Sequence, residues 1–407
     1  MVRNDERATT SAELRTHNLA RLLRAVHDGG GQRTRAALTR QLGLARGTAT
    51  VLVRELAGQR LIDELPATGP GSANGTDTER RSRGRPTGVP SAHPEGPVAI
   101  AVDLRDDSFT TGAFELTGRG QVLARHERDP ADGDGAQLLK QVGAALAKHR
   151  RTFKSRVIGT GIAVPSPVSG GTMMQPILAD WRGVDVAAAL GAVYIGNDAR
   201  LAGLAEARRG VLSGISVALH LHAVTGIGGV LLTDGQPVSG GHGAAGEFGH
   251  MPLAGGDAPC QCGASGCWEL YAGSRGLLRE AGLPERGDRM AMAAGVIAAA
   301  AADPSCASAR AVAVAGHALG RGIGALVNAH DPEAVGLSGL SASLFQAAPD
   351  AVQQGYLAAL MRFHRDAPPP LLASTLGDLG ALTGAAELAF DAFLTPRGLT
   401  AWQGKTR

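Results

Sequence analysis

Residues 246–269 read GEFGHMPLAGGDAPCQCGASGCWE, a glycine-rich segment that holds one histidine and three cysteines. Nine residues separate His250 from Cys260, one separates Cys260 from Cys262, and four separate Cys262 from Cys267. One imidazole and three thiolates are the four tetrahedral ligands of a zinc site with no open position, which is a structural site. Unliganded thiols or a disulfide are the alternatives, and the close spacing favours a metal. We predict structural zinc here, with the distant Cys306 as a bystander.

The bulk composition is that of a globular protein with several cores. A length of 407 residues is too much for one ordinary core and predicts two or three domains. Hydrophobic residues make up 44% of the chain and charged residues 19%. No run of about 20 apolar residues occurs and the first residues are polar, so we expect neither a membrane span nor a secretion signal. The expected location is the cytoplasm, with no membrane partner.

Charge divides the chain into a basic beginning and a slightly acidic remainder. Residues 1–90 contain 15 arginines and 9 acids, a balance of +6, whereas residues 91–407 contain 25 basic and 28 acidic residues, a balance of −3. A small basic segment on an acidic body is typical of proteins whose head binds a polyanion. A merely solvated basic surface is the alternative.

Three short helices are predicted in this basic segment. The first covers residues 12–28 and ends at Gly29, the second covers residues 34–42 with Thr34 as its N-cap, and the third covers residues 46–57. A short apolar run at Leu61 and Ile62 follows. This pattern predicts a winged helix-turn-helix that binds DNA, with a protein-docking module as the alternative. The side chains expected to face its core are Leu14, Leu19, Leu22, Leu23, Val26, Val51, Leu52 and Leu56.

Residues 66–94 have almost no apolar side chains and cannot build a core. They are predicted to form a wing followed by a linker. The basic part, residues 80–85, could lie against phosphate or in a minor groove, or it could be a solvated tether.

The body begins where apolar strand patterns appear. Residues 97–104 (PVAIAVDL) and 156–165 (RVIGTGIAVP) predict buried strands, and residues 216–224 and 226–235 predict a hairpin. Alanine-rich helical segments at 187–190, 201–209 and 290–302 alternate with them. Strands and helices that alternate over about 300 residues indicate an α/β body with two lobes and a cleft.

Several motifs, in this order, resemble those of the ROK family (repressors, open reading frames and kinases). They are GTGIAVPSPV at 159–168, GNDARLAGLAEA at 196–207, TGIGGVLLTDG at 225–235, the 246–269 segment and STLGDLGALTGAAELA at 374–389. The segment 35–62 with SRGRP at 82–86 resembles the DNA-binding head of the family's repressors. The resemblance implies an α/β, actin-like (sugar-kinase-type) two-lobed body preceded by an all-α winged helix-turn-helix domain. The implied domains are 1–65 (head), 66–95 (wing and linker), 96–212 (first lobe) and 213–407 (second lobe, with the last helices packed on the first).

The same resemblance implies a sugar site. In related sugar kinases the asparagine and aspartate of the NDA motif touch the sugar, and the aspartate acts as base. Here these residues are Asn197 and Asp198, so Asp198 is the implied catalytic residue if the protein is a kinase. The corresponding glutamates that hold sugar hydroxyls are Glu247 and Glu269, and His250 is implied to lie near the sugar as well as on zinc. Carboxylates and an amide suit vicinal hydroxyls. Ser166 departs from the glycine that is common between two prolines in the family, and is expected to narrow the pocket.

Kinase activity is not expected. The family's first phosphate loop reads Asp-x-Gly-Gly-Thr, whereas residues 103–107 read Asp-Leu-Arg-Asp-Asp. Both glycines are replaced, so backbone amides cannot approach phosphate closely. A carboxylate about 4 Å from phosphate would cost roughly 4 kcal/mol at an effective dielectric near 20. The second loop, residues 225–229, is intact, while residues 338–340 (Ser-Gly-Leu) are less suited to a nucleotide than a triple glycine.

The sequence therefore predicts a sugar-responsive transcription regulator, most simply a repressor of carbohydrate-metabolism genes, that acts as a homodimer or homotetramer on operator DNA. An active ATP-dependent sugar kinase with an added head is the alternative, and a regulator that senses a protein partner is another. The start of the third helix is predicted to contact DNA through Arg46, Thr48 and Thr50, with Arg46 as the base reader. Phosphate contacts are predicted for Arg35 and Arg54. Minor-groove contacts are predicted for Arg83 and Arg85 of the linker.

Overall fold

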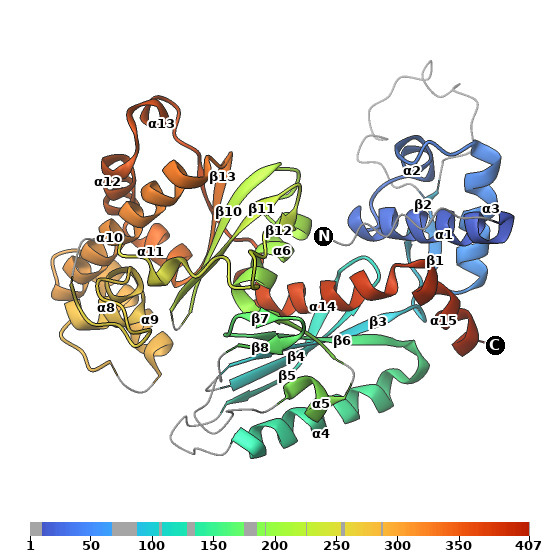
Figure 1. Cartoon of the computed structure of the whole chain (residues 1–407), viewed down its shortest axis with the longest axis horizontal. Helices are drawn as coiled ribbons and strands as arrows, with labels where there is room; N and C mark the ends of the chain where they lie inside the picture. The colour runs from blue at the N-terminus through green and yellow to red at the C-terminus, as the bar shows by residue number, and fades with distance from the viewer. Residues whose placement is uncertain are drawn as a thin grey trace.

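A computed structural model of the chain describes residues 10–66, 88–105, 108–127, 135–174, 185–191, 193–224, 226–253, 257–285 and 288–406. It shows a small N-terminal head and a body built on two five-stranded sheets (Figure 1). The predicted fold class, a two-lobed α/β body behind a helical head, is confirmed. The predicted DNA contacts Arg83 and Arg85 lie outside the described residues, as do Asp106, Asp107 and Thr225 of the phosphate loops.

The head consists of three helices and a two-stranded antiparallel sheet. Thr10 begins the first helix with a capping box that it shares with Glu13, and Thr34 caps the second as predicted. Gly30 and Gly31, both at positive φ, carry the chain away from the first helix. The elements are α1 (Ser11–Asp28), α2 (Arg35–Gln41), α3 (Arg46–Gly58), β1 (Ile62–Leu65) and β2 (Val89–Ala92).

The head core differs from the prediction at two positions. Leu14 is 53% exposed and Val51 is 47% exposed, so neither packs inside. Val53 is buried instead of Val51. The reason is the helical period: Val53 shares a face with Leu52 and Leu56, while Val51 lies on the outer face of α3.

The first lobe forms around a strand that is buried at every position, β3. Alternate side chains of β3 pack on opposite faces, since Ile100 and Val102 meet α4 while Ala99 and Ala101 meet α14. The sheet order is β5-β4-β3-β6-β9. The elements are β3 (Val98–Leu104), β4 (Ser108–Glu115), β5 (Gly120–Glu127), α4 (Gly135–Phe153), η3 (Lys154–Arg156), β6 (Val157–Val164), β7 (Val168–Ser169), β8 (Thr172–Met173), α5 (Val186–Leu190), β9 (Tyr194–Asn197) and α6 (Asp198–Arg209).

The second lobe repeats this arrangement, with sheet order β12-β11-β10-β13-β14. In both sheets three strands form an antiparallel meander and two further strands run parallel to the first. The predicted hairpin is β10–β11. The elements are β10 (Val217–Ala223), β11 (Ile227–Thr233), β12 (Gln236–Pro237), η5 (Phe248–His250), α7 (Glu269–Ala272), α8 (Ser274–Glu280), α9 (Arg289–Ala302), α10 (Ala307–His330), β13 (Ala334–Gly339), α11 (Leu340–Ala347), α12 (Pro349–Ala359), α13 (Arg362–Asp366), β14 (Leu371–Ala373) and η6 (Gly377–Leu379).

The last two helices return to the first lobe. Helix α14 (Gly380–Phe393) lies along β3 and β6, and α15 (Pro396–Thr406) lies between it and the head (Figure 1). The approach of α14 to the sheet is close: a side chain at Gly161 of β6 would collide with the backbone of Ala385. Small residues on both surfaces therefore set the position of α14.

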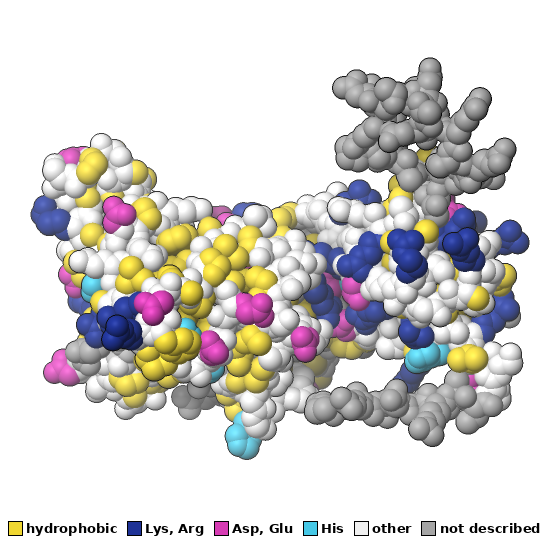
Figure 2. Space-filling view, turned by 90° about the horizontal axis from the view of Figure 1, so that it is seen from above, with side chains coloured by type: hydrophobic (Ala, Val, Ile, Leu, Met, Phe, Trp, Pro, Cys, Tyr) yellow, Lys and Arg dark blue, Asp and Glu magenta, His cyan; other side chains and the backbone are white. Residues whose placement is uncertain are grey.

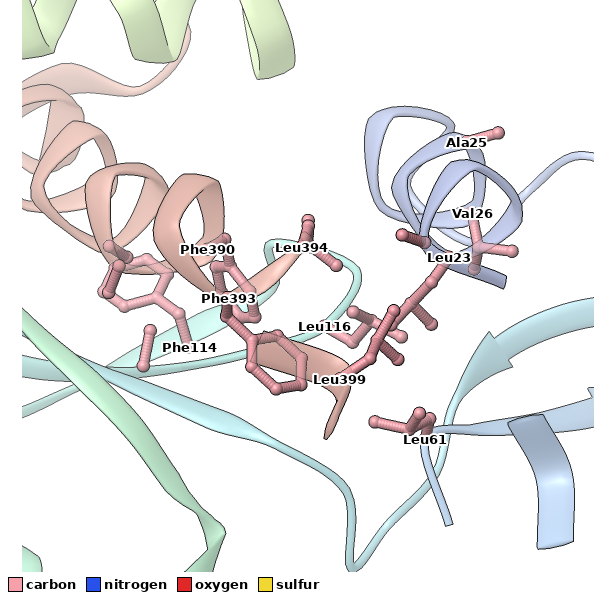
Figure 3. Close-up of a cluster of buried hydrophobic side chains, with 14 of the residues drawn as sticks. Leu23, Ala25, Val26, Leu61, Phe114, Leu116, Phe390, Phe393, Leu394 and Leu399 are labelled. Carbon is pink, nitrogen blue, oxygen red and sulfur yellow. The ribbon is translucent and has the colours of Figure 1, made fainter. Parts of the chain in front are cut away.

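One hydrophobic core joins the head to the body. Leu23 and Val26 of α1 and Leu61 next to β1 pack with Phe393 and Leu399 of the last helices (Figure 3). Trp402 belongs to the same cluster, and its indole N–H donates to the backbone carbonyl of Gln59, 2.9 Å away. The head is thus packed on the body and shares a core with it.

No single described helix is long and apolar enough to cross a membrane. One bent pair, Arg289–Ala302 with Ala307–His330, meets that test jointly, and its two helices are inclined at 112°.

Removal of an interface side chain is expected to destabilise head and body together. Leu399 is fully buried, and Leu399→Ala should lower the free energy of unfolding by about 2–5 kcal/mol. Urea denaturation followed by tryptophan fluorescence measures the loss. Leu14→Ala, at an exposed position of α1, is the control and should change stability by less than about 0.5 kcal/mol. Equal effects of the two variants would contradict the shared core.

Candidate sugar site and metal centre

The four predicted zinc ligands come together. One ligand atom from each of His250, Cys260, Cys262 and Cys267 lies within 4.8 Å of the others. Cys260 Sγ is 3.7 Å from His250 Nδ1, and Cys262 Sγ is 3.6 Å from Cys267 Sγ. Tetrahedral zinc with Zn–S near 2.3 Å and Zn–N near 2.0–2.1 Å requires ligand atoms about 3.6–3.8 Å apart. The donor set and its spacing therefore fit a structural zinc ion.

Backbone turns bring these ligands into register. Gly263 and Gly266 both have positive φ, and the Cys260 amide donates to the Ala264 carbonyl across the turn. The loop is anchored by Trp268, which is fully buried and donates its indole N–H to the Ala318 carbonyl. Cys306 is elsewhere, at the N-cap of α10, where its sulfur accepts a bond from the Ala309 amide.

The five predicted sugar-site residues line one cavity of about 210 Å³ between the two lobes. The first lobe supplies Asn197 and Asp198, where β9 ends and α6 begins. The second lobe supplies Glu247 and His250 around η5 and Glu269 at the start of α7. The volume is below the 300–1,000 Å³ typical of sites for drug-sized molecules, so the cavity suits a small polar ligand.

The start of α6 holds Asn197 and Asp198 firmly. Asn197 is the N-cap: its Oδ1 accepts from the Arg200 amide at 3.0 Å, and its Nδ2 donates to the Ser166 carbonyl at 3.3 Å. Asp198 Oδ1 accepts from the Ala199 amide at 2.6 Å. Ser166 is 2% exposed and lines the cavity.

Glu269 lines the cavity and also lies close to two of the four possible metal ligands. Its Oε1 lies 3.6 Å from Cys260 Sγ and 3.8 Å from His250 Nδ1, while a side chain at Gly226 would approach its Oε2. The histidine that can bind metal through Nδ1 also lines the cavity. A metal at the cysteines would therefore fix the wall that presents Glu269 and His250 to a ligand.

Two carboxyl groups of the cavity, those of Asp198 and Glu247, resist ionisation. Burial, and after it the negative charge of Asp103, raises the pKa of Asp198 to about 7. Burial raises the pKa of Glu247 as well, opposed by His250 and reinforced by Glu269. Near neutral pH this wall can offer both donors and acceptors to hydroxyl groups.

Arg105, in the segment that the resemblance aligns with a phosphate loop, also lines the cavity. Arg105 donates to Asp103 Oδ2 from Nη2 at 2.9 Å and from Nε at 3.1 Å. Asp103 stands at the end of β3 and is 4% exposed. The described part of the loop thus presents an ion pair in place of open backbone amides.

Sequence reasoning missed His222, which lines the same cavity from β10. Its Nδ1 lies 2.8 Å from Ser338 Oγ, and its buried Nε2 has no hydrogen-bond partner among the described residues. Burial lowers its pKa to about 3, with His220 and Arg105 adding to the effect, so the ring is neutral. The available signal was a pair of histidines, His220 and His222, inside an otherwise apolar strand.

The predicted DNA contacts within the described residues lie on α2 and α3 of the head, where basic side chains gather on the face seen in Figure 2. Arg46, Thr48 and Arg54 are exposed on α3. The Thr50 hydroxyl donates to the Arg46 carbonyl within the helix. Arg35 forms an ion pair with Glu64 of β1 at 3.1 Å, so its charge is shared with a carboxylate.

The raised pKa of Asp198 leads to a pH-dependent prediction. Its folded pKa of about 7 exceeds the ordinary 3.8, so the stability it contributes is complete below about pH 4 and is lost as pH rises through about 7. Asp198→Asn, which cannot ionise, should therefore stabilise the protein at pH 8 and stabilise it less at pH 5, where only part of the penalty for a buried carboxyl has built up. At about 1.4 kcal/mol per pKa unit the gain is at most a few kcal/mol.

Thermal unfolding at the two pH values measures this difference. Asp350→Asn, at an exposed position in the first turn of α12, is the control and should act alike at both. An equal shift for Asp198→Asn at pH 5 and pH 8 would contradict the assignment.

Comparison with known proteins identifies relatives of two kinds. A kanosamine kinase of Amycolatopsis mediterranei is 33% identical over 65% of this chain and 86% of that enzyme. A xylose repressor of Bacillus spizizenii is 25% identical over 60% of this chain and 63% of the repressor. A glucokinase of Halalkalibacterium halodurans is 31% identical over 40% of this chain and 53% of that enzyme. The chain therefore spans about half of the length of that glucokinase and under two thirds of the length of the repressor.

Solved structures share the fold. A ROK family transcriptional regulator, a homologue of the Escherichia coli MLC protein, superposes with a TM-score of 0.69 at 24% identity, covering 96% of this chain and 98% of that one. A ROK family glucokinase from Streptomyces griseus, solved with glucose and AMPPNP, superposes with a TM-score of 0.61 at 24% identity. The match covers 72% of this chain and 99% of that one. The ROK family profile matches residues 99–392, and with the similarity to kanosamine kinase this places the chain in the ROK family.

Proposed function

We propose that this protein is a cytoplasmic, sugar-responsive transcription regulator, acting as a repressor of carbohydrate-metabolism genes. The observation that carries the proposal is the convergence of five sugar-type side chains on one interlobe cavity in a chain that also bears a helix-turn-helix head. The superposed regulator covers 96% of the chain and the glucokinase only 72%, in agreement with a head that the regulator shares. The proposed domains are 1–65, 66–95, 96–212 and 213–407.

Each cavity residue has a role suited to a monosaccharide. Asn197 offers one amide acceptor and one donor, and Asp198 and Glu269 offer carboxylate acceptors for neighbouring hydroxyls. Glu247 and His250 complete the wall on the second lobe. A closed cleft strengthens these bonds because it excludes water.

Zinc is proposed as a structural cofactor held by His250, Cys260, Cys262 and Cys267. When bound it supplies rigidity, because four ligands from one short loop leave no open coordination position. The residues that would respond to the sugar are thereby kept in place.

DNA recognition is assigned to α3 of the head. Arg46 is the proposed base reader, because arginine can bond guanine bidentately in the major groove. Thr48, Thr50 and Arg54 would support it, and Arg35 would reach phosphate only if it leaves Glu64. A homodimer or homotetramer would place two heads on successive half-sites of a duplex operator.

A sugar kinase is the second candidate, favoured by Asp198, whose pKa of about 7 suits a general base, and by relatives that are kinases. Against it stands the first loop, in which Asp103 and Arg105 form an ion pair. Ser338 also stands against it, because its hydroxyl meets His222 where a glycine would leave space. We propose that the protein does not phosphorylate sugars.

Calorimetry with hexoses, pentoses and amino sugars tests the function. At least one of them should bind, and Glu269→Gln should weaken its binding by about 10–100-fold, the worth of one hydrogen bond to a charged group. Glu280→Gln, at an exposed position of α8, is the control and should bind as the native protein does.

The same sugar should alter the affinity for a duplex taken from upstream of the protein's own gene, measured by fluorescence anisotropy. Arg46→Ala should abolish specific binding of that duplex. Formation of a phosphorylated sugar from Mg-ATP, lost in Asp198→Asn, would establish the kinase instead. An absence of heat across the whole sugar panel would point to a protein effector.

Zinc removal is expected to damage both stability and sugar binding. Metal analysis should find a single zinc ion per chain in the native protein, and a chelator should lower the melting temperature. Cys267→Ser should lose the metal and the sugar affinity, because its side chain is fully buried in the cluster. Cys306→Ser is the matched control and should keep both. Zinc-free native protein with full sugar affinity would refute a structural role.

A further inference from the structure

We propose that helix α6 couples the sugar cavity to the DNA-binding head through a partly buried ion cluster at its C-terminal end, an inference that rests on the proposed function. The cluster, here called the latch, consists of residues from α1, α6 and α14: Arg24, His27, Arg208, Arg209, Glu387 and Asp391.

The two ends of α6 lie at the two sites. Its first residue, Asp198, lines the cavity, and its last two, Arg208 and Arg209, belong to the latch. At about 1.5 Å per residue, a twelve-residue helix spans roughly 18 Å. One continuous rigid element therefore connects the two places.

The latch ties the head to that element. His27 of α1 lies 2.8 Å from Glu387 Oε2, and Arg209 donates to the His27 carbonyl and to Glu387 Oε1. Arg208 bonds Glu387 and Asp391, and Arg24 of the head pairs with the same Asp391. Both α1 residues thus depend on charges that α6 and α14 position.

Burial makes this arrangement sensitive to geometry. Glu387 is 1% exposed and His27 is fully buried. Burial opposes ionisation of Glu387, yet His27, Arg209 and Arg208 hold its pKa well below the usual range, so the carboxylate is charged. A buried charge that loses a partner is strongly destabilised, so a small displacement of α6 favours a different latch arrangement.

The packing of α6 allows little independent movement. A side chain at Gly384 of α14 would collide with the Leu201 carbonyl, and one at Gly203 of α6 would collide with Val230 of β11. Helix α6 is therefore in contact with α14 on one side and with the second sheet on another. A change in the angle between the lobes has to move it.

The head has space to respond. A hollow of about 680 Å³ lies beside the latch, lined by Arg24 and Asp28 of α1 and by the turns at 213–216 and 234–236 of the second lobe. If the ion pairs of the latch rearrange, α1 can shift into this space. The sugar can drive such a shift only if it binds one arrangement of the latch more tightly than the other, and the difference in affinity sets the size of the shift.

The test measures coupling separately from binding. D-glucose and D-xylose are titrated by calorimetry into the native full-length protein and into Arg209→Gln, and the affinity for the upstream duplex is measured with and without saturating sugar. In the native protein the sugar should change that affinity by about 5–150-fold. In Arg209→Gln the ratio should fall towards 1 while the sugar affinity stays within about twofold of the native value.

Two further variants keep the result interpretable. Arg24→Gln removes only the outer pair with Asp391 and leaves Glu387 paired, so it should fold even if Arg209→Gln does not, and should reduce the ratio in the same direction. Arg60→Gln breaks an exposed pair between Arg60 and Glu95 and is the matched control, expected to couple as the native protein does.

Each outcome separates the two levels of the argument. Native coupling retained in both Arg209→Gln and Arg24→Gln, with sugar and DNA still bound, overturns the latch and leaves the proposed function intact. Loss of coupling in Arg60→Gln to the same extent also overturns the latch, because breaking an ion pair outside the latch would then have the same effect as breaking one within it. No heat with these two sugars or with any other member of the sugar panel removes the proposed function and the latch together.

Discussion

Helix α6 occupies the position on which the rest of the structure depends, because it is the element that both lobes and the C-terminal helices share. Its backbone lies against α14 at Gly384 and its own Gly203 lies against β11, so glycine at each contact lets the surfaces approach. The N-cap at Asn197 fixes one end, and the charges at Arg208 and Arg209 fix the other. Close packing on both sides links the position of α6 to the angle between the lobes.

The cavity and the metal loop are arranged around that fixed helix. The first lobe presents Asn197 and Asp198 through backbone bonds of the helix start, and the second presents Glu269 through a loop whose cysteines and histidine meet at zinc-ligand spacing. A ligand held from both sides would respond to the angle between the lobes. The head shares a hydrophobic core with α15 and α14 (Figure 3). A change in the angle between the lobes would therefore move the head as well.

Much of this could be predicted where the cause is local. The four possible metal ligands lie close together because only short loops separate them. Helix caps and apolar patterns predicted the three helices of the head and, in the body, strands β3 and β6, the hairpin β10–β11 and helices α5, α6 and α9. The errors were local too: Leu14 and Val51 are apolar but lie on outer faces of their helices. His222 was missed because a histidine in an apolar strand is usually a core residue, and only the cavity distinguishes it.

The sequence by itself determined the basic head and the four possible metal ligands through local composition and spacing, and the alternation of strands and helices indicated the two-lobed body. The proposed sugar-site residues came from the motifs that resemble the ROK family. Only the tertiary structure decided that the head packs on the body through one core. It alone brought His27 to Glu387, 360 positions away. Buried ion pairs between distant segments have no sequence signal, because each member is an ordinary charged residue until packing excludes water from it.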